Sequence, residues 1–591
     1  MVRAPRLGSP AYHLLLASVA VFILGPLGGV AAAYMNFSIG FFLGGQVLAG
    51  ILGSTVTFPY GPEGKHGANY MQTMAASVAG MCAMSVLVQA MVWLGLPEPP
   101  AWQLVLYFLC IGMFGVGVGM LYTPLLVDRM RLPYPSGFAV ANILRALTDR
   151  ALLRRSVAKL GGGMLLGYVT GVSSLKIAAL KSFGVSAATL GGGMIVGARI
   201  AIPALVVALL GAWQKPQLVR IGWLGPEDPY RKIGFIISLG AILGAAILDV
   251  GLILARAVRR FREQAVAANP PAEDWKRVNT FRLILWVIFW GAGTAVVGAR
   301  VLHQPLWFLL VAIGLSFLFV LVNGISQGLS DWNPLSSAFV MTVFVMAALG
   351  LRDAGVGLLC ASILVIACNE GCDMQQDRST GSRLGTNRVV QFRYQVIGIT
   401  MGAVLAVVLA RVFMSAFPIL NQDQFAHPHL EGAQKWQSAM TYKVVGALRG
   451  ITHSQPQVMK ALQLGVALGL LIELARKLLK RRPGYQRFRE RSATGRATDF
   501  LLDAAVLPSP YAAAFGGFVE LPTVLWWAAG GISATGFDSL TAARSTETAG
   551  AGTASLPADM SAMSLVGGGL IAGDSLAALS VGLYGLWQAL S

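Results

Sequence analysis

The chain has 591 residues, of which 55% are hydrophobic and only 12% are charged. Soluble domains carry roughly 25% charged residues, so this composition excludes an ordinary soluble protein and indicates a polytopic membrane protein. The formal net charge of +19 is explained by loop charges that set topology and contact membrane lipids, and it requires no nucleic-acid partner.

Apolar segments follow one another along almost the whole chain. About 20 residues are needed to cross a hydrocarbon core, and about 14–16 segments approach that length, several of them interrupted by glycine or proline. They predict an all-α polytopic membrane protein with a single transmembrane domain over residues 1–591. The expected spanning segments are 12–34, 36–57, 70–95, 102–124, 157–173, 186–212, 233–257, 281–301, 304–325, 334–351, 353–369, 392–415, 457–478, 511–533 and 560–588.

Two segments carry most of the positive charge. Residues 256–282 and 476–496 are rich in Arg and Lys, and the Pro270-Pro271 pair breaks any helix through the first of them. Because Lys and Arg accumulate in short cytoplasmic loops, we expect both segments to be cytoplasmic. Residues 421–432 contain no Lys or Arg and are expected to face outward.

Glycine is the other compositional bias, with 70 residues. The segments 159–171, 189–200 and 565–576 each contain a Gly-Gly-Gly cluster followed by another glycine four residues on. Glycines at this spacing share a helix face and allow two backbones to approach closely in lipid. Such runs also weaken helices, and broken helices expose backbone groups to the cargo of a transporter. Both interpretations remain open from the sequence.

The first polar stretch is TFPYGPEGKHGANYMQTMAASVAG, residues 57–80. Asn69 and Gln72 are three residues apart and therefore share one helix face. A polar face at the mouth of a membrane helix is typical of a permeation path, which makes Gln72 a candidate substrate contact. A solvated loop followed by a helix cap is the alternative.

Two further polar stretches contain prolines. In residues 131–147, Pro133 and Pro135 forbid a regular helix, so a new helix begins near Gly137 and offers free backbone N–H groups to an anionic cargo group. In residues 324–343, a proline favours an extended turn before a helix restarts. Plain loops between spans are the alternative in both cases. The candidate substrate contacts in these stretches are Tyr134, Ser136, Asp331 and Asn333.

The stretch ILVIACNEGCDMQQDRSTGSRLG, residues 363–385, places acidic residues directly after an apolar run. Glu370, Asp373 and Asp377 are spaced i, i+3, i+7, so all three line one stripe if the helix continues past the apolar run. Ionisable groups at membrane depth are costly and are functional by default. Coupled acids beside bases are what a proton relay requires; a solvated loop of ordinary ion pairs is the alternative. Gln376 is a further candidate substrate contact.

Several motifs of the chain resemble those of the oligopeptide transporter (OPT) superfamily. This superfamily includes peptide transporters and yellow-stripe-like metal-chelate transporters, and the resemblance is to a bacterial-type member. The similarity extends from about residue 40 to about residue 585. The motifs are QTMAASVAG, RLPYPSGFAVANIL, GGGMIVGARIAIP, GLSDWNPLSS, DMQQD followed by TG and LG, and GGGLIAGDSL.

The chain departs from the pattern of the superfamily at two positions. Ser379 stands where relatives carry a lysine, and Arg378 lies one place earlier. If that lysine contacts a cargo or Asp377 in relatives, the role has moved to Arg378 or the substrate differs. Asp574 replaces the glutamate that frequently follows the last glycine cluster, which is a conservative change.

The resemblance implies a secondary-active transporter that moves small oligopeptides or peptide-like metal chelates together with protons. It also implies an all-helical fold with two related halves, a homodimer, and a multi-pass protein of the inner (plasma) membrane. Asp373, Asp377 and Glu370 would be the coupling acids, and Gln376 and Asn333 would contact the cargo. An uncoupled channel or facilitator for small polar solutes is the alternative.

We expect neither an enzyme nor a resident cofactor. The sequence contains no HExxH motif, and the histidines of HPH at 427–429 and the pair Cys368 and Cys372 each fall short of a complete set of metal ligands. No metal site is therefore assigned to the protein itself.

Overall fold

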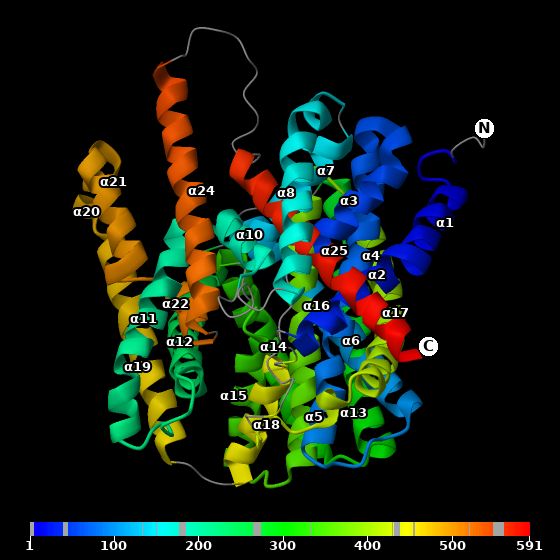
Figure 1. Cartoon of the computed structure of the whole chain (residues 1–591), viewed down its shortest axis with the longest axis vertical. Helices are drawn as coiled ribbons and strands as arrows, with labels where there is room; N and C mark the ends of the chain where they lie inside the picture. Colours follow the sequence, from blue (N-terminus) through cyan, green and yellow to red (C-terminus); the bar gives the residue numbers. More distant parts are fainter. Residues whose placement is uncertain are drawn as a thin grey trace. The chain divides into compact units, whose positions relative to one another are not determined.

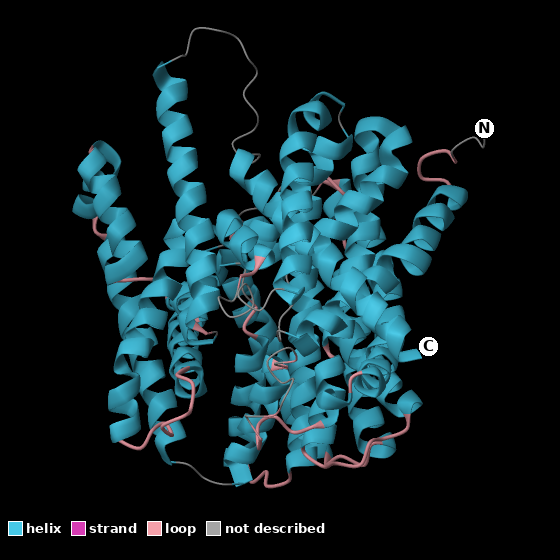
Figure 2. Cartoon of the chain, viewed as in Figure 1, coloured by secondary structure: helices cyan, strands magenta, loops and turns pink. Residues whose placement is uncertain are grey.

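The computed structural model is helical throughout the residues that it describes, with no strand among them (Figures 1 and 2). Nine of the described helices are long and apolar enough to cross a membrane, judged by length and composition. The predicted all-α polytopic fold is therefore confirmed. The structure describes residues 5–590 with the exception of 39–44, 133, 149, 177–184, 264–272, 331–332, 428–429, 431–435, 437, 453–455, 519 and 548–560.

The helices form two compact units. Unit 1 comprises residues 1–172, 273–454 and 568–591, and unit 2 comprises residues 173–272 and 455–567. The boundary between the two units falls within the helices α8 (Arg150–Lys176) and α25 (Ala562–Leu590).

Unit 1 contains most of the helices that meet the length of a membrane span. Several of them are extended or joined by short 3₁₀ or π segments, labelled η. In chain order the elements of unit 1 are α1 (Pro10–Val19), η1 (Ala20–Leu24), α2 (Gly25–Ser38), α3 (Gly45–Thr57), η2 (Phe58–Glu63), α4 (Gly64–Ala83), α5 (Ser85–Trp93), α6 (Ala101–Thr123), η3 (Pro124–Arg129), α7 (Pro135–Thr148), η4 (Asp274–Lys276), α13 (Thr280–Val296), η5 (Val297–Val301), α14 (Leu306–Ser330), α15 (Leu335–Ala348), α16 (Ala354–Leu384), α17 (Arg388–Ala416), η6 (Pro418–Asn421) and α18 (Ala439–Thr452).

The helix α16 occupies the centre of unit 1. It contacts α4, α6, α7, α14 and α15, and most of its residues are buried. Glycines on α6 allow the closest approach: a Cβ added to Gly115 would lie 2.6 Å from the Cα of Ala367, and Gly119 faces the backbone of Gly371 in the same way. The two helices therefore meet backbone to backbone, which is the packing that small residues permit.

The helix α16 is longer than the sequence indicates. Hydropathy predicts a span over residues 353–369, but the helix continues to Leu384 and ends where Gly385 adopts a left-handed conformation with φ of 74°. Hydropathy treats the polar residues after 369 as solvated, whereas most of them are buried against neighbouring helices. Glu370, Asp373 and Asp377 therefore lie on one continuous helix, as the acidic stripe requires.

Two of the glycine clusters pack against each other within unit 1. A Cβ added to Gly167 of α8 would lie 2.9 Å from the Cα of Leu570, and one added to Gly569 of α25 would lie 2.9 Å from the backbone nitrogen of Met164. The close-packing interpretation is thus confirmed for Gly167 and Gly569, whereas a Cβ added to Gly161 or Gly162 would meet nothing within 4 Å.

Unit 2 is built on two pairs of closely packed helices, α12 with α19 and α10 with α24. Gly240 of α12 and Gly465 of α19 face each other, and a Cβ added to Gly240 would lie 2.8 Å from the Cα of Gly465. The elements of unit 2 are α10 (Ala187–Val196), α11 (Ala198–Arg220), α12 (Arg231–Glu263), α19 (Pro456–Arg481), α20 (Pro483–Arg491), α21 (Ala493–Leu501), η7 (Leu502–Val506), α22 (Pro510–Ala513), α23 (Phe515–Phe518) and α24 (Leu521–Glu547).

The second glycine cluster shows both of its possible uses. Gly193 of α10 packs against the backbone of Trp527 on α24, as expected for close packing. Gly197 has a φ of 76° and separates α10 from α11, so the predicted span over 186–212 is interrupted there, which is the broken-helix interpretation left open by the sequence. The backbone N–H of Ala198, freed by the break, donates to Thr535 Oγ1 (2.8 Å).

The two basic segments have different structures. The segment 476–496 contains the end of α19, the helix α20 and the start of α21, rather than an irregular loop. In the segment 256–282, α12 continues to Glu263, and the predicted break at Pro270-Pro271 lies outside the described residues.

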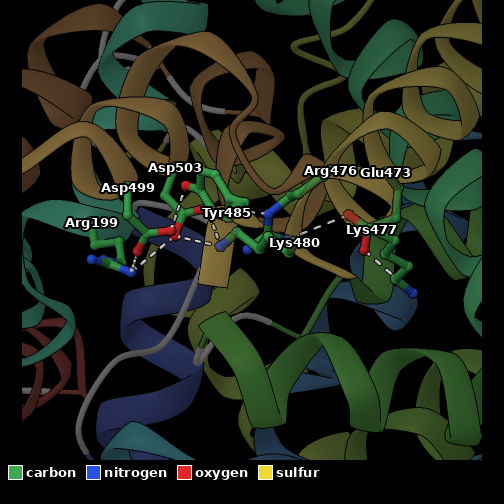
Figure 3. A network of polar contacts seen from close by, with 8 residues as sticks. All are labelled: Arg199, Glu473, Arg476, Lys477, Lys480, Tyr485, Asp499 and Asp503. Carbon is green, nitrogen blue, oxygen red and sulfur yellow. Dashed lines mark hydrogen bonds and ion pairs between the residues drawn. The ribbon is translucent and has the colours of Figure 1, made fainter. Parts of the chain in front are cut away.

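A network of ion pairs joins α11, α19, α20, α21 and η7 of unit 2 (Figure 3). Asp503 is at its centre. Its carboxylate forms ion pairs with Arg199 (2.9 Å), Arg476 (3.4 Å) and Lys480 (2.6 Å). Because Asp503 is almost fully buried, these cations compensate a charge that would otherwise be costly.

Asp499 forms the second centre of this network. It accepts hydrogen bonds from Arg199 (3.1 Å) and from the hydroxyl of Tyr485 (2.8 Å). Burial together with the hydrogen bond to Asp499 raises the pKa of Tyr485 to about 12, so the hydroxyl remains a donor at neutral pH. The network thereby joins α20 to α21 and α21 to α11, while Asp503 of η7 connects this group to the basic end of α19. Glu473 completes it by pairing with Arg476 and Lys477.

We expect Asp499→Asn to lower thermal stability by about 1–3 kcal/mol, the usual value of hydrogen bonds to a charged group, in a pH-dependent manner. Burial opposes ionisation of Asp499, but Tyr485, Lys480 and Arg199 outweigh it, so the pKa of Asp499 lies below its ordinary value. The stabilisation is then complete above pH of about 4 and disappears as the pH falls further. Thermal unfolding of the wild-type and Asp499→Asn proteins should show a difference in melting temperature that narrows below pH of about 4. A difference that stays constant with pH would contradict the assignment of this stabilisation to the Asp499 carboxylate.

Candidate functional site

The acidic stripe of α16 lies inside unit 1. Glu370 and Asp377 are fully buried, and Asp373 is half-buried. Gln72 of α4, 305 residues away in the chain, donates from Nε2 to Asp377 Oδ1 (2.8 Å). The structure therefore brings together one predicted substrate contact and one predicted coupling acid.

The helix α17 supplies a second amide beside Asp377. Gln391 donates from Nε2 to the backbone oxygen of Asp377 (2.9 Å) and to Thr73 Oγ1 (3.0 Å) of α4. Four residues later, Gln395 Oε1 accepts a hydrogen bond from the fully buried Arg378 (3.3 Å). These amides connect α4, α16 and α17 around the Asp377-Arg378 pair.

Several polar atoms around this pair have no hydrogen-bond partner among the described residues. They include an oxygen of Asp377, the Oε1 of Gln72, and two nitrogens of Arg378. Nor does any described carboxylate lie within ion-pair distance of Arg378. Buried polar atoms without partners are costly, and they are the atoms that a cargo group, an ion or water would satisfy.

Glu370 and Asp373 lie against a glycine of α4. A Cβ added to Gly80 would lie 2.7 Å from Asn369 Nδ2, 2.8 Å from Glu370 Oε1 and 3.1 Å from Asp373 Oδ2. Asn369 also donates to Glu370 Oε1 (3.2 Å). The missing side chain at Gly80 thus provides the space in which these three polar groups meet.

We expect Gly80→Ala to reduce the transport activity that the sequence resemblance predicts more than it reduces stability. The added methyl would collide with the ends of three side chains, which can move aside, so the stability cost should stay within about 1–3 kcal/mol. Displacing Glu370 and Asp373 should nevertheless lower the rate of uptake in proteoliposomes. Gly314→Ala is the matched control, because a Cβ at Gly314 meets nothing within 4 Å; equal uptake by the two variants would contradict the role of Gly80.

Amide side chains of α14 contact the same stripe from another side. Gln327 donates from Nε2 to Gln376 Oε1 and lies 3.5 Å from Asp373 Oδ1. Asn333, just after α14, accepts from Asn323 (3.0 Å) and donates to the backbone oxygen of Cys368 (3.4 Å). Gln376 therefore lies on α16 and Asn333 contacts this helix; their contact with cargo stays a prediction. Asp331 lies outside the described residues.

Tyr134 connects α7 to α14 and α16. Its φ is 44°, an uncommon conformation for a residue other than glycine. Its N–H donates to the oxygen of Gly328 (2.9 Å), and its hydroxyl donates to Gly324 O (3.2 Å) and Gln375 Oε1 (3.4 Å). Tyr134 is fully buried and Ser136 is half-buried, and their predicted contact with substrate stays a prediction.

Sequence reasoning missed several polar residues of this site. Each is an amide or hydroxyl residue inside an otherwise apolar helix. This pattern could have identified them from the sequence. They are Thr73, Gln327, Asn369, Gln391 and Gln395.

One sequence pattern could be mistaken for a hydrolase motif. Residues 324–328, GISQG, match GxSxG, which in hydrolases forms a sharp turn between a strand and a helix. Here the five residues lie within the regular helix α14. Ser326 is therefore not on a nucleophile elbow, and its burial within the helix gives it a packing role.

Comparison with known proteins extends over nearly the whole chain. The family model described as "OPT oligopeptide transporter protein" matches residues 15–583. Among curated proteins, "Probable metal-nicotianamine transporter YSL6" of Oryza sativa subsp. japonica is 26% identical over 229 residues, which are 34% of this chain and 34% of that protein.

Two other relatives are similar over shorter stretches. "Metal-nicotianamine transporter YSL2" of Arabidopsis thaliana is 28% identical over 183 residues, 30% of this chain and 26% of that protein. "Probable metal-nicotianamine transporter YSL8" of Oryza sativa subsp. japonica is 30% identical over 115 residues, 19% of this chain and 17% of that protein. The chain thus matches about a third or less of the length of these relatives.

Proposed function

The chain belongs to the OPT oligopeptide transporter family, and we propose that it is a secondary-active transporter that moves a small oligopeptide or a peptide-like metal chelate together with protons. Members of this family are transporters rather than enzymes. The apolar helices and the family together make the chain a multi-pass membrane protein. The inner (plasma) membrane as its location, and a homodimer as its assembly, are part of the proposal.

The observation that carries the proposal is the burial of Glu370 and Asp377 inside an apolar helix. Neither forms an ion pair with a cation among the described residues. A carboxyl group in such surroundings is more stable when protonated, and it releases its proton when water or a cation approaches. A change of surroundings during transport would then load and unload protons. Asp373, half-buried beside Glu370, would exchange protons with this pair.

The proposed cargo contacts are the polar side chains around the same stripe. Gln72, Gln376 and Asn333 present amides from three different helices or their ends, as recognition of a peptide bond or a chelate carboxylate requires. Arg378, which stands beside the position where relatives carry a lysine, is a candidate partner for a cargo carboxylate because two of its nitrogens have no partner among the described residues. Tyr134 and Ser136, at the start of α7, are further proposed cargo contacts.

The relatives are named for transport of metal-nicotianamine, which favours a metal chelate over a simple peptide as cargo. Uptake by purified protein in proteoliposomes, with and without an inward pH gradient, tests the proposal. Accumulation of a chelate or peptide above its external concentration, only with the gradient, is the expected result. Equilibration that ignores the gradient would instead indicate an uncoupled facilitator.

A further inference from the structure

The end of α19 and the hairpin of α20 and α21 carry arginines that the ion network of unit 2 does not use. In Figure 3 the cations of this network point toward Glu473, Asp499 and Asp503. Four other arginines in the same stretch are exposed and form no ion pair or side-chain hydrogen bond with any residue that the structure describes. These are Arg481, Arg482, Arg487 and Arg496.

This group of four, which we call the outer arginines, is close to the end of a membrane span. The helix α19 is long and apolar enough to cross the membrane and ends with Lys480 and Arg481. Basic residues at the end of a span lie at the level of the lipid headgroups. Only Arg482 separates α19 from α20, so the hairpin begins at this level.

The hairpin also exposes apolar side chains next to the outer arginines. Phe488 is 44% exposed, Leu501 is 60% exposed and Val506, just after the hairpin, is 66% exposed. Helices that combine basic and exposed apolar residues lie in the membrane interface, with the apolar side chains between the headgroups. A soluble polyanion would use the arginines but would leave these apolar side chains in water.

We propose that the α20–α21 hairpin is a docking site for anionic phospholipid headgroups, bound by the outer arginines and anchored by Phe488 and Leu501. The ion network holds the hairpin in place, because Tyr485 on α20 and Asp499 on α21 bond to each other and Asp499 to Arg199 of α11. This inference is independent of the cargo and of proton coupling.

Hydrogen–deuterium exchange of the full-length protein in lipid nanodiscs tests the proposal. Amides of residues 483–501 should exchange more slowly in discs of phosphatidylcholine with phosphatidylglycerol than in discs of phosphatidylcholine alone. Each basic residue near an anionic surface contributes about 1 kcal/mol, which corresponds to about fivefold in protection per arginine. Added salt should remove the difference, since headgroup attraction is screened.

A pair of matched variants separates charge from structure. Arg481→Gln/Arg482→Gln/Arg487→Gln/Arg496→Gln should lose the dependence on phosphatidylglycerol, and the corresponding quadruple Lys variant should keep it. Neither variant alters Tyr485, Asp499 or Asp503. Equal exchange in both lipids for the wild-type protein would overturn the proposal. So would equal protection from inorganic phosphate or a soluble polyanion in phosphatidylcholine discs, which would assign the site to a soluble anion.

Discussion

Asp377→Asn is expected to abolish pH-gradient-driven uptake while the protein still folds. The Asn side chain keeps an oxygen that can accept the hydrogen bond from Gln72, so the contact between α4 and α16 is preserved. An amide, however, does not take up or release a proton in the working range, and the coupling step would be lost. Uptake with a gradient should fall to the level measured without one, whereas exchange of cargo at equal pH should persist.

The measurement is uptake in proteoliposomes at matched protein density, with thermal unfolding as a check on the fold. Glu98→Gln is the matched control, because it also removes one carboxylate. Glu98 lies outside the candidate spans and pairs loosely with Arg411 (3.8 Å), so its removal should leave coupling unchanged. Gradient-driven uptake by the Asp377→Asn protein at the wild-type rate would remove Asp377 from the coupling pathway.

Gly119→Ala is expected to destabilise unit 1 strongly. The added Cβ would lie 2.7 Å from the Cα of Gly371, and the carbonyl of Gly371 is closer still. Both are backbone atoms of the central helix, so no side-chain rotation can relieve the collision and the helices α6 and α16 must separate. Overpacking usually costs about 1–3 kcal/mol, and we expect the upper end of this range or more.

Thermal unfolding of the purified protein in detergent measures this effect. Gly293→Ala on α13 is the control, because its nearest neighbour, Cys110 Sγ, would be 3.6 Å from the new Cβ, an ordinary contact. A melting temperature for Gly119→Ala equal to that of Gly293→Ala would show that α6 and α16 are less tightly packed than the structure indicates.

The helical class and the acidic stripe were predictable from local sequence. The spacing of Glu370, Asp373 and Asp377 defines one helix face wherever the helix extends, and α16 does extend through all three. The burial of this stripe inside unit 1 was not predictable. It depends on Gln72 and Gly80 of α4, about 300 residues earlier in the chain, and a hydropathy window contains no information on contacts at such separation.

The glycine clusters show the same division between local and tertiary information. Their spacing predicts a small-residue face, and Gly167 and Gly193 use it for close packing. The identical composition at Gly197 instead produces a break between α10 and α11. Close packing needs a neighbouring backbone at that position, and a break needs a partner for the freed N–H, here Thr535. The sequence of the glycine cluster does not indicate which of these two partners is present.

The amide contacts described for Gln391 have a mechanical consequence. Because the Gln391 side chain bonds both to Thr73 and to the backbone of Asp377, it joins the first turn of α17 to α4 and to the last turns of α16. The glycine contacts between α6 and α16 add a fourth helix. Opening a route for solute by sliding these four helices past one another would break several buried bonds at once. The helix α7 is also held against α16, because Thr380 Oγ1 donates to the backbone oxygen of Gly137 (2.9 Å) and a Cβ added to Gly137 would lie 2.8 Å from the backbone oxygen of Gln376. This bonding pattern favours movement of these helices together with α7 as one block.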